Sequence, residues 1–347
     1  MTIAPDLGVP FTLGPHRPGG RAVLAPLSGV TDPVFRRIAG RWGAAYTVTE
    51  MVASDEFVRG AEEARLRAEG AGIGPHVVQL AGCEPGWLAE AARLAEGAGA
   101  DVIDINMGCP AKRVTGGLAG SALMRDPAQA GRLIAAVIGA VRVPVTVKMR
   151  LGWDEDSLNA PELARIAEAL GAAALTVHGR TRRQLYKGQA DWVRIGAVVR
   201  AVQVPVVANG DVACAATAAA CLRDSGAAAV MVGRAALGRP WLVGQIGDAL
   251  GGRAPREPDA VTRAEAAVEH YEGLLALYGR EVGIRHARKH LAAYADAGGS
   301  AGDRPAERAR LVTSECPAEV VRLLHALVAG ADQPCRRPDD HPRREAA

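Results

Sequence analysis

The amino-acid sequence predicts an α/β protein, a (β/α)8 TIM barrel followed by a small C-terminal helical domain. Eight short runs rich in Val and Ile recur along the first 250 residues. Most lack polar alternation, as is typical of parallel strands buried on both faces. Stretches of helical periodicity separate several of these runs. A barrel of this kind typically takes about 250 residues, and the span 21–250 is close to that length.

The eight runs are the predicted strands of the barrel. In chain order they are Arg21–Leu27, Ala45–Thr49, His76–Leu80, Asp101–Asn106, Pro144–Met149, Ala173–His178, Pro205–Asn209 and Ala228–Gly233. Helices are predicted between them at Pro85–Gly97, Pro127–Ala140 and Ala160–Leu170. A doubly wound sheet is the competing fold, but it seldom needs eight evenly spaced strands, and no GxGxxG pattern follows a strand here.

The chain outside the barrel has a different character. Residues 1–20 are rich in Pro and Gly and form a predicted lead-in to a barrel domain over 21–253. A linker-like stretch, 251–259, opens a helical domain over 254–335. Its amphipathic helices are predicted at Thr262–Tyr278, Ile284–Asp296 and Ala318–Val328. Residues 336–347 have the Pro and charge content of a disordered tail.

The composition argues against several classes of protein. No apolar run approaches the roughly 18 residues of a membrane span. The N-terminus also lacks a signal-peptide pattern, so we expect a cytoplasmic location and no membrane partner. The six cysteines include no CxxC pair and no HExxH motif occurs, so no metal site is predicted. A net charge of +3 is too small to indicate a nucleic-acid partner by itself.

Polar groups or glycines stand at or just after the end of every predicted strand. In order they are Ser28; Glu50; Gln79; Asn106 with Cys109; Lys148 with Arg150; His178 with Arg180; Asn209, Gly210 and Asp211; Gly233 and Arg234. Active sites of these barrels lie at the C-terminal ends of the strands, so these residues are candidates for a site. Loops also begin there, and any single one is consistent with ordinary loop composition. Their presence at all eight ends favours a functional site.

The last two strand ends predict a phosphate site. Asn209, Gly210 and Asp211 follow the seventh run, and Gly233 and Arg234 follow the eighth, which is the usual phosphate position of such barrels. Glycine lets backbone N–H groups approach phosphate oxygens, and arginine adds a forked cationic donor. The alternative is that both glycines serve only as turns. A phosphate at this place suggests a phosphorylated cofactor.

Three further strand-end residues fit a flavin. Lys148 ends a buried strand, where an ammonium near the ring would stabilise the anionic reduced form; the alternative is a lysine that reaches the rim. Gln79 could pair with the amide edge of the ring. His178 could contact phosphate or substrate, and a hydrogen-bonded structural histidine is an equally good interpretation.

Cys109 lies between Gly108 and Pro110, just past the strand that ends at Asn106. This is where a barrel enzyme holds its chemistry. Read alone, it is better interpreted as a small buried thiol, because free cysteine packs as a hydrophobe. The other strand ends favour the functional interpretation.

These motifs resemble the bacterial tRNA-dihydrouridine synthases, most closely the B-type subfamily, also called NifR3-like. The matching stretches are 25–33, 49–51, 78–80, 104–112, 118–123, 145–150, 176–181, 208–211, 231–234 and 285–290. The resemblance therefore runs from about residue 20 to about 295, and the sequence Asn-Met-Gly-Cys-Pro at 106–110 is its most specific part.

The resemblance implies an NAD(P)-dependent oxidoreductase acting on a CH–CH bond. Such an enzyme uses FMN, re-reduced by NADPH, to reduce the C5=C6 bond of a D-loop uridine in tRNA. Hydride passes to C6, and the cysteine matching Cys109 protonates C5; a thiol of ordinary pKa, about 8.5, is protonated at neutral pH. Asn106 would grip the uracil edge. The implied substrate contacts also include Lys112, Arg150 and Arg180. The implied flavin contacts are Pro26, Leu27, Ser28, Gln79, Lys148, Gly210, Gly233 and Arg234.

The helical domain would supply further RNA surface. Arg285, Arg288 and Lys289 fall broadly on one side of a predicted helix, and without the resemblance they could equally be a solvated charged face. One alternative function is a flavin barrel acting on a free pyrimidine, as dihydroorotate dehydrogenase does, although a small substrate needs no basic helical domain. Another is a non-catalytic RNA-binding protein. Nothing in the sequence indicates an obligate protein partner.

Overall fold

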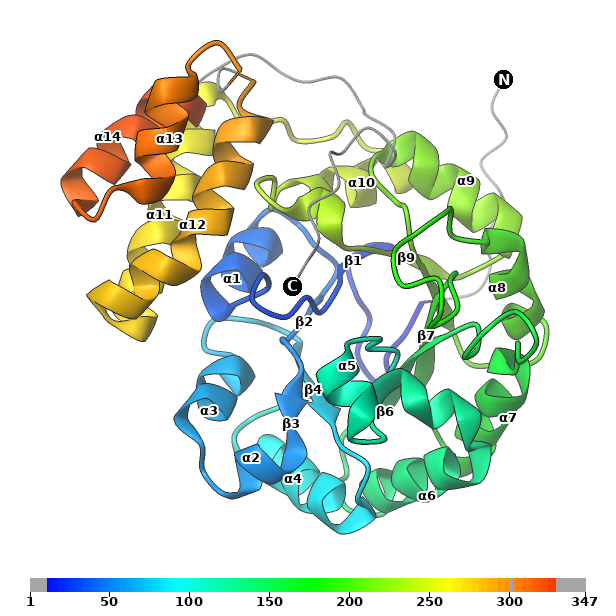
Figure 1. Cartoon of the computed structure of the whole chain (residues 1–347). Coiled ribbons are helices and arrows are strands. Elements are labelled where there is room, and N and C mark those ends of the chain that lie inside the picture. Colours follow the sequence, from blue (N-terminus) through cyan, green and yellow to red (C-terminus); the bar gives the residue numbers. More distant parts are fainter. Residues whose placement is uncertain (1–10, 300–301, 329–347) are drawn as a thin grey trace.

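The computed structural model describes residues 11–299 and 302–328, and it confirms the barrel followed by C-terminal helices. The barrel strands are β1 (Ala22–Leu24), β2 (Thr47–Val48), β4 (His76–Ala81), β5 (Val102–Met107), β6 (Val145–Arg150), β7 (Ala174–His178), β8 (Val206–Asn209) and β9 (Ala229–Val232). All neighbouring pairs are parallel, and the pairing of β2 with β4 closes the ring seen end-on in Figure 1. A short extra strand, β3 (Val52–Ala53), pairs with the end of β4.

Each predicted run overlaps one barrel strand, with ends that differ by a few residues. The first run is the most shortened, because β1 stops at Leu24, close before Pro26, which has no N–H for a ladder. The predicted helices are α4 (Pro85–Gly97), α6 (Pro127–Ile138) and α7 (Ala160–Leu170). The other helices around the barrel are α1 (Pro33–Arg41), α2 (Ser54–Val58), α3 (Glu62–Ala68), α8 (Trp192–Val199), α9 (Ala215–Ser225) and α10 (Leu242–Leu250).

Proline and aspartate start several of these helices. Pro33 opens α1 and Pro127 opens α6, where the fixed φ suits the first turn and the missing N–H costs nothing. The carboxylate of Asp32 accepts the N–H groups of Val34 and Phe35, each at 3.0 Å, and so caps α1.

The strand pleat sorts the barrel side chains into two sets. On β5, Ile103 and Ile105 point outward and pack in the large core between strands and helices. Val102 belongs instead to a small inner core, and Asp104 and Asn106 follow on the same face, because alternate residues share a face. The barrel interior therefore changes from apolar to polar towards the carboxyl ends of the strands.

The lead-in residues close the amino-terminal end of that inner core. Leu13 is buried with Val23, Tyr46 and Val102. Phe11 stacks on Tyr46 with ring centroids 6.0 Å apart. This apolar plug leaves the carboxyl end as the polar mouth of the barrel.

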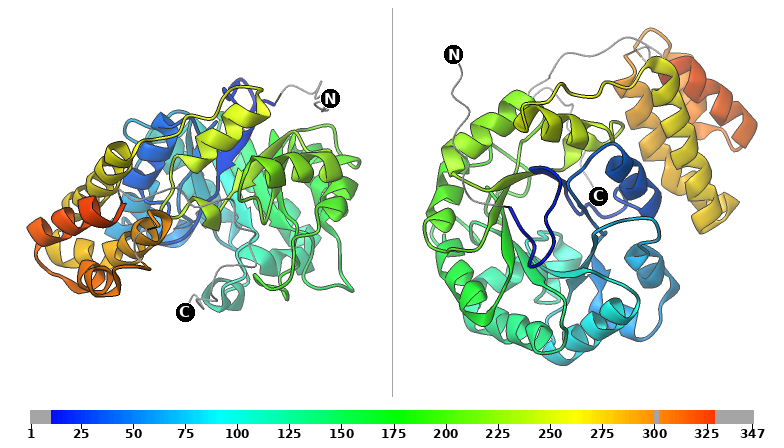
Figure 2. Two further views of the ribbon diagram at one scale, coloured as in Figure 1. Left: turned by 90° about the horizontal axis from the view of Figure 1, so that it is seen from above. Right: turned by 180° about the vertical axis from the view of Figure 1, so that it is seen from behind.

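Four helices form a bundle beside α1, drawn from yellow to red in Figures 1 and 2: α11 (Ala260–Tyr278), α12 (Arg280–Ala297), α13 (Pro305–Thr313) and α14 (Pro317–Val328). α13 was not predicted. Val34, Ile38 and Trp241 of the barrel share the core of the bundle. Gly238 approaches α12 so closely that a Cβ there would lie 2.3 Å from the carbonyl oxygen of Ala293. The bundle is thus packed directly against the barrel.

Two sequence predictions fall partly or wholly beyond the described residues. The tail at 336–347 and the end of the helical domain at 329–335 lie outside them, as do residues 1–10 of the lead-in. Within 11–299 and 302–328, none of the helices is both long and apolar enough to span a bilayer.

Candidate active site

The inward-facing residues at the carboxyl ends of five neighbouring strands form a buried polar ring. The ring consists of Gln79 (β4), Asn106 (β5), Lys148 and Arg150 (β6), His178 (β7) and Asn209 (β8), each at most 9% exposed. Strand register places Asn106 beside Lys148, and His178 beside both Arg150 and Asn209. The structure therefore brings these predicted site residues together at the mouth of the barrel.

Cys109 follows the ring, in a loop fixed from two sides. Oδ1 of Asn106 accepts the N–H groups of Cys109 at 2.9 Å and of Gly108 at 3.2 Å. The carbonyl oxygen of Cys109 accepts the backbone N–H and the hydroxyl of Ser121, at 3.0 and 2.9 Å. The half-buried thiol is thus carried on a well-anchored backbone.

The side chain of Asn106 is itself held from below. Its Nδ2 donates to Oε1 of Gln79 at 2.7 Å, and Nε2 of Gln79 donates to Asp104 at 2.7 Å. Asp104 also accepts the hydroxyl of Thr146 at 2.6 Å. Asp104 was not a predicted site residue, since it stands inside an apolar run, although its spacing of two from Asn106 places both on one strand face.

Lys148 is a buried cation whose charge is compensated by few neighbouring groups. Its Nζ donates to Oδ1 of Asn209 at 3.1 Å, and Asn209 is fixed in turn by donating to the carbonyl of Met231. In the described part of the chain, no carboxylate lies within ion-pair distance of this ammonium. Burial, together with the charge of Arg150, lowers the pKa of Lys148 to about 8, although Asp104 and Cys109 oppose the shift.

His178 is buried among cations. Burial first, and then the charges of Arg150, Lys148, Arg180 and Arg234, lower its pKa well below the usual value of 6.5. It is therefore neutral at pH 7. A neutral imidazole inside a set of positive groups leaves the mouth attractive to anions.

Arg150 and Arg180 are both 1% exposed and have donors engaged by the protein itself. Arg180 binds Asp211 through two nitrogens, at 2.9 and 2.7 Å. Arg150 donates to the carbonyl of Gly108 at 2.8 Å and to two carbonyls of the loop after β7. Their role as substrate contacts stays a prediction; what the geometry shows is two arginines that hold the walls of the mouth.

The predicted phosphate site, at the ends of β8 and β9, has a backbone conformation that suits phosphate binding. Gly210 has φ +119°, and a Cβ there would lie 2.6 Å from that of Ala190, so only glycine fits. At Gly233 a Cβ would meet nothing closer than 3.8 Å, which leaves the backbone open. Arg234 is 54% exposed at its side chain and lies 3.4 Å from Asp211, free to turn towards an anion.

Tyr186 is a mouth residue that was not predicted from the sequence. It is 47% exposed, on the loop after β7. The guanidinium carbons of Arg150 and Arg234 lie 5.7 and 5.2 Å from its ring centroid. An exposed aromatic ring between two cations suits a base and its phosphate. Tyr186 lies in the loop sequence Gln-Leu-Tyr-Lys, which has no helical or strand periodicity that would identify it as a site residue.

The remaining predicted contacts lie around the rim. Pro26 and Leu27 are half-buried and Ser28 is exposed in the loop after β1. Lys112 is exposed at the start of α5 (Lys112–Gly116), a short helix in front of the barrel mouth in Figure 1. Arg285, Arg288 and Lys289 are exposed on α12, and their contact with RNA stays a prediction. Lys289 reaches the barrel, because a Cβ on Gly29 would lie 2.6 Å from its Nζ.

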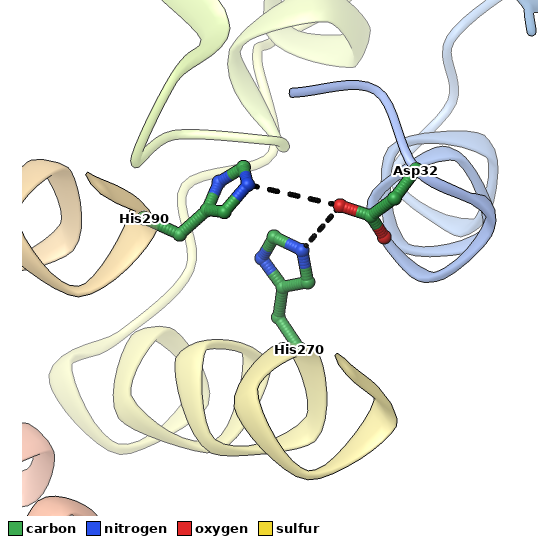
Figure 3. A group of neighbouring side chains, drawn as sticks. All are labelled: Asp32, His270 and His290. Atoms are coloured by element: carbon green, nitrogen blue, oxygen red, sulfur yellow. Dashed lines mark hydrogen bonds and ion pairs between the residues drawn. The ribbon is translucent and has the colours of Figure 1, made fainter. Parts of the chain in front are cut away.

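A second polar cluster joins the helical bundle to the barrel (Figure 3). Oδ2 of Asp32 lies 2.9 Å from Nε2 of His270 and 3.8 Å from Nε2 of His290, and Nδ1 of His270 lies 3.1 Å from the hydroxyl of Tyr294. Among the described residues, these two histidines and Asp32 are the one group with metal-like spacing. The 2.9 Å contact is that of a hydrogen bond. We interpret the group as an interdomain hydrogen-bond cluster, and the absence of a metal site stays a prediction.

Comparison with known proteins agrees with the motifs and the geometry. The family model "Dihydrouridine synthase (Dus)" matches residues 23–318. A "Probable tRNA-dihydrouridine synthase" of Rhizobium leguminosarum bv. phaseoli is 55% identical over 90% of this chain and 96% of its own length. A "tRNA-dihydrouridine synthase B" of Xanthomonas campestris pv. campestris is 46% identical over 93% and 98% of the two chains.

Among solved structures, histamine dehydrogenase from Rhizobium sp. 4-9 matches with a TM-score of 0.54 and 15% identity, over 76% of this chain and 50% of that one. At this identity the likeness concerns the barrel fold alone. The family model and the relatives cover the barrel mouth and most of the bundle, and they confirm the resemblance drawn from the motifs. The chain therefore belongs to the dihydrouridine synthase family, as an enzyme of the B type.

Proposed function

We propose that this enzyme reduces the C5=C6 bond of a D-loop uridine in cytoplasmic tRNA, with bound FMN as the cofactor and NADPH as the reductant. The observation that carries the proposal is that Cys109 and Lys148 lie at the carboxyl ends of neighbouring strands. The loop of Cys109 and the ammonium of Lys148 belong to neighbouring strands at the mouth, where Asn106 is in register with Lys148. A thiol and a cation thus face one polar mouth.

The residues present fit an anionic ring and a phosphate. A buried ammonium has three donors, and Lys148 has one neutral acceptor among the described residues, so it has donors to spare. The open backbone at Gly233 and the half-exposed Arg234 suit the phosphate. Pro26, Leu27, Ser28 and Gln79 would line the ring, with Asn209, Gly210, Asp211 and His178 around its polar side. When bound and reduced by NADPH, FMN supplies the hydride for uracil C6.

The chain's own residues would orient the base and supply the proton. Asn106 fixes the backbone of Cys109, so the thiol has a defined place at the mouth. A protonated thiol can donate to uracil C5 as the electron density there rises. Asn106 retains one Nδ2 hydrogen beyond its bond to Gln79, which would be available to a uracil carbonyl.

The rim would bind the RNA. Lys112, Arg234 and Tyr186 are exposed around the mouth, and Arg285, Arg288 and Lys289 extend the positive surface onto α12. The target base must leave its stack to reach the barrel interior. Phosphate contacts at the rim would offset that cost, and they predict tRNA binding that weakens as salt rises.

The experiment is dihydrouridine formation on unmodified tRNA transcripts with FMN and NADPH, measured by mass spectrometry of the nucleosides. Wild-type protein should form dihydrouridine, and Cys109→Ala should lower the rate on the order of a hundredfold, as loss of a general acid does. Free uracil and orotate are the competing substrates. Equal rates on orotate and tRNA would contradict the proposal.

A further inference from the structure

Asp104 is a buried carboxylate to which the proposed reaction gives no role. It lies on the inner face of β5 and is 4% exposed. Burial raises the pKa of this carboxyl, and the hydrogen bonds from Gln79 and Thr146, with the charge of Lys148, counteract part of the rise. Burying a carboxyl group is costly unless it is hydrogen-bonded. The hydrogen bonds that offset this cost lead from Asp104 towards the loop that carries Cys109.

A continuous series of hydrogen bonds leads from this carboxylate to Cys109. Asp104 accepts from Nε2 of Gln79 at 2.7 Å, Gln79 accepts from Nδ2 of Asn106 at 2.7 Å, and Asn106 accepts from the N–H of Cys109 at 2.9 Å. Gln79 is 1% exposed and Asn106 is 7% exposed, so water does not substitute freely for these bonds.

The two ends of the series set the direction of both amides between them. At the upper end, the backbone N–H of Cys109 can only donate, so Asn106 must present its oxygen there. At the lower end, an ionised carboxylate can only accept, so Gln79 must present its NH2 group to Asp104. The NH2 group of Asn106 then faces the amide oxygen of Gln79, so a donor meets an acceptor between the two side chains. With Asp104 ionised, this arrangement satisfies each of these buried groups.

We propose that Asp104 is a positioning residue for the reaction, acting through Gln79 and Asn106 to hold the Cys109 thiol in place. The inference rests on the proposed role of Cys109 as proton donor. Without the carboxylate, Gln79 loses the acceptor that orients it, its amide can reverse, and Asn106 loses its support. A thiol displaced by about 1 Å is enough to cost on the order of a hundredfold in rate.

The test is a double-mutant cycle on the single-turnover rate of tRNA reduction. Asp104→Leu in the wild-type background, assayed at saturating FMN, should lower the rate ten- to a hundredfold, with the Kd for tRNA changed less than about threefold. In a Cys109→Ser background the same substitution should have little further effect, because a residue that acts through Cys109 is not additive with it. Asp104→Asn should stay within about fivefold of wild type, since its amide oxygen still accepts from Gln79.

An assay without turnover accompanies the cycle. The rate of carbamidomethylation of Cys109, followed peptide by peptide in the full-length holoenzyme, should rise at least about threefold in Asp104→Leu, while exposed Cys316 is the internal reference. Asp104→Ala replaces the leucine variant if that variant does not fold. Asp248→Leu is the matched control, because Asp248 is also a buried carboxylate but lies on α10 and pairs with Arg253 and Arg256, which follow that helix.

The outcomes separate two failures. Additive losses in the Cys109→Ser background, or an unchanged alkylation rate at Cys109, overturn the role of Asp104. A Cys109→Ser variant as fast as wild type overturns the proton-donor role of Cys109 instead, and the alkylation assay then still reports whether Asp104 holds the loop.

Discussion

At the scale of single residues, the charge on Lys148 depends on what binds beside it. Burial lowers its pKa to about 8 in the free protein, so part of the population loses its charge in mildly alkaline solution. An anionic group held next to the ammonium would raise the pKa again, because opposite charge favours the protonated form. Cofactor binding and proton uptake by Lys148 should therefore be linked.

The linkage predicts weaker FMN binding at high pH. As the pH rises from 7 to 9.5, the Kd of apoprotein for FMN should increase, since the neutral amine no longer attracts the electron-rich N1/C2=O edge of the ring. Lys148→Met should raise the Kd about tenfold at pH 7 and remove most of the pH dependence. Fluorescence titration measures both quantities, with Lys187→Met at the exposed rim as the control. If Lys148→Met binds FMN as tightly as wild type, the placement of the ring is wrong.

At the scale of elements, two buried arginines hold the loop between β7 and α8. Arg150 donates to the carbonyls of Thr181 and Leu185, and Arg180 donates to those of Lys187 and Gly188. Each arginine also bonds outside the loop, Arg150 to Gly108 and Arg180 to Asp211. The loop that carries Tyr186 is thereby tied to the thiol loop and to the phosphate end.

The pair of Arg180 and Asp211 should therefore contribute much more to stability than a surface pair. Arg180→Met leaves the largely buried carboxylate of Asp211 with only the longer contact to the half-exposed Arg234, which should lower the unfolding free energy by about 3 kcal/mol. The double variant Arg180→Met/Asp211→Asn should regain part of that loss, because no charge is then stranded and asparagine suits the left-handed backbone at φ 56° and still accepts the N–H of Ala190. Arg194→Met, which breaks the exposed contact with Glu155, should cost at most about 1 kcal/mol. Urea denaturation measures all three, and similar losses for the two arginines would contradict the interpretation.

At the scale of the whole molecule, the barrel was predictable because each strand leaves a local mark. A run such as His76–Leu80 is short and mostly apolar with a polar residue, Gln79, near its end, and it contains most of β4. The helix α13 left no such mark, since Pro305–Thr313 is short and buries only Leu311 of its own residues. Short charged segments take their structure from what they pack against, which a local pattern does not contain.

The polar ring was predictable for the same reason, because every strand end reaches the same mouth. The hydrogen-bond partners within the ring depend on contacts between different strands. The link from Asp104 through Gln79 to Asn106 joins β4 and β5, and the contact between Asp32 and His270 joins residues 238 apart in sequence. Sequence patterns report the face on which a side chain lies, whereas its partner depends on tertiary packing.

The interdomain cluster makes the stability of the whole molecule sensitive to acid. His290 is 2% exposed, and burial, followed by the charge of His270, lowers its pKa well below 6.5, although Asp32 opposes the shift. It therefore stays neutral in the folded state while the unfolded chain takes up a proton below about pH 6.5. The unfolding free energy should fall as the pH drops from 7 towards 5, by up to about 1.4 kcal/mol per pH unit for this residue.

His178 at the mouth has the same sign of shift and adds to the slope in the wild-type protein. His290→Asn removes the proton that His290 takes up on unfolding, so its stability should fall less steeply between pH 7 and 5, even though it starts from a lower value. The exposed His325→Gln is the control. Urea denaturation at pH 7, 6 and 5 gives the three slopes. Parallel slopes for wild type and His290→Asn would mean that His290 is not held neutral between the barrel and the bundle, and that the cluster does not couple their packing to pH.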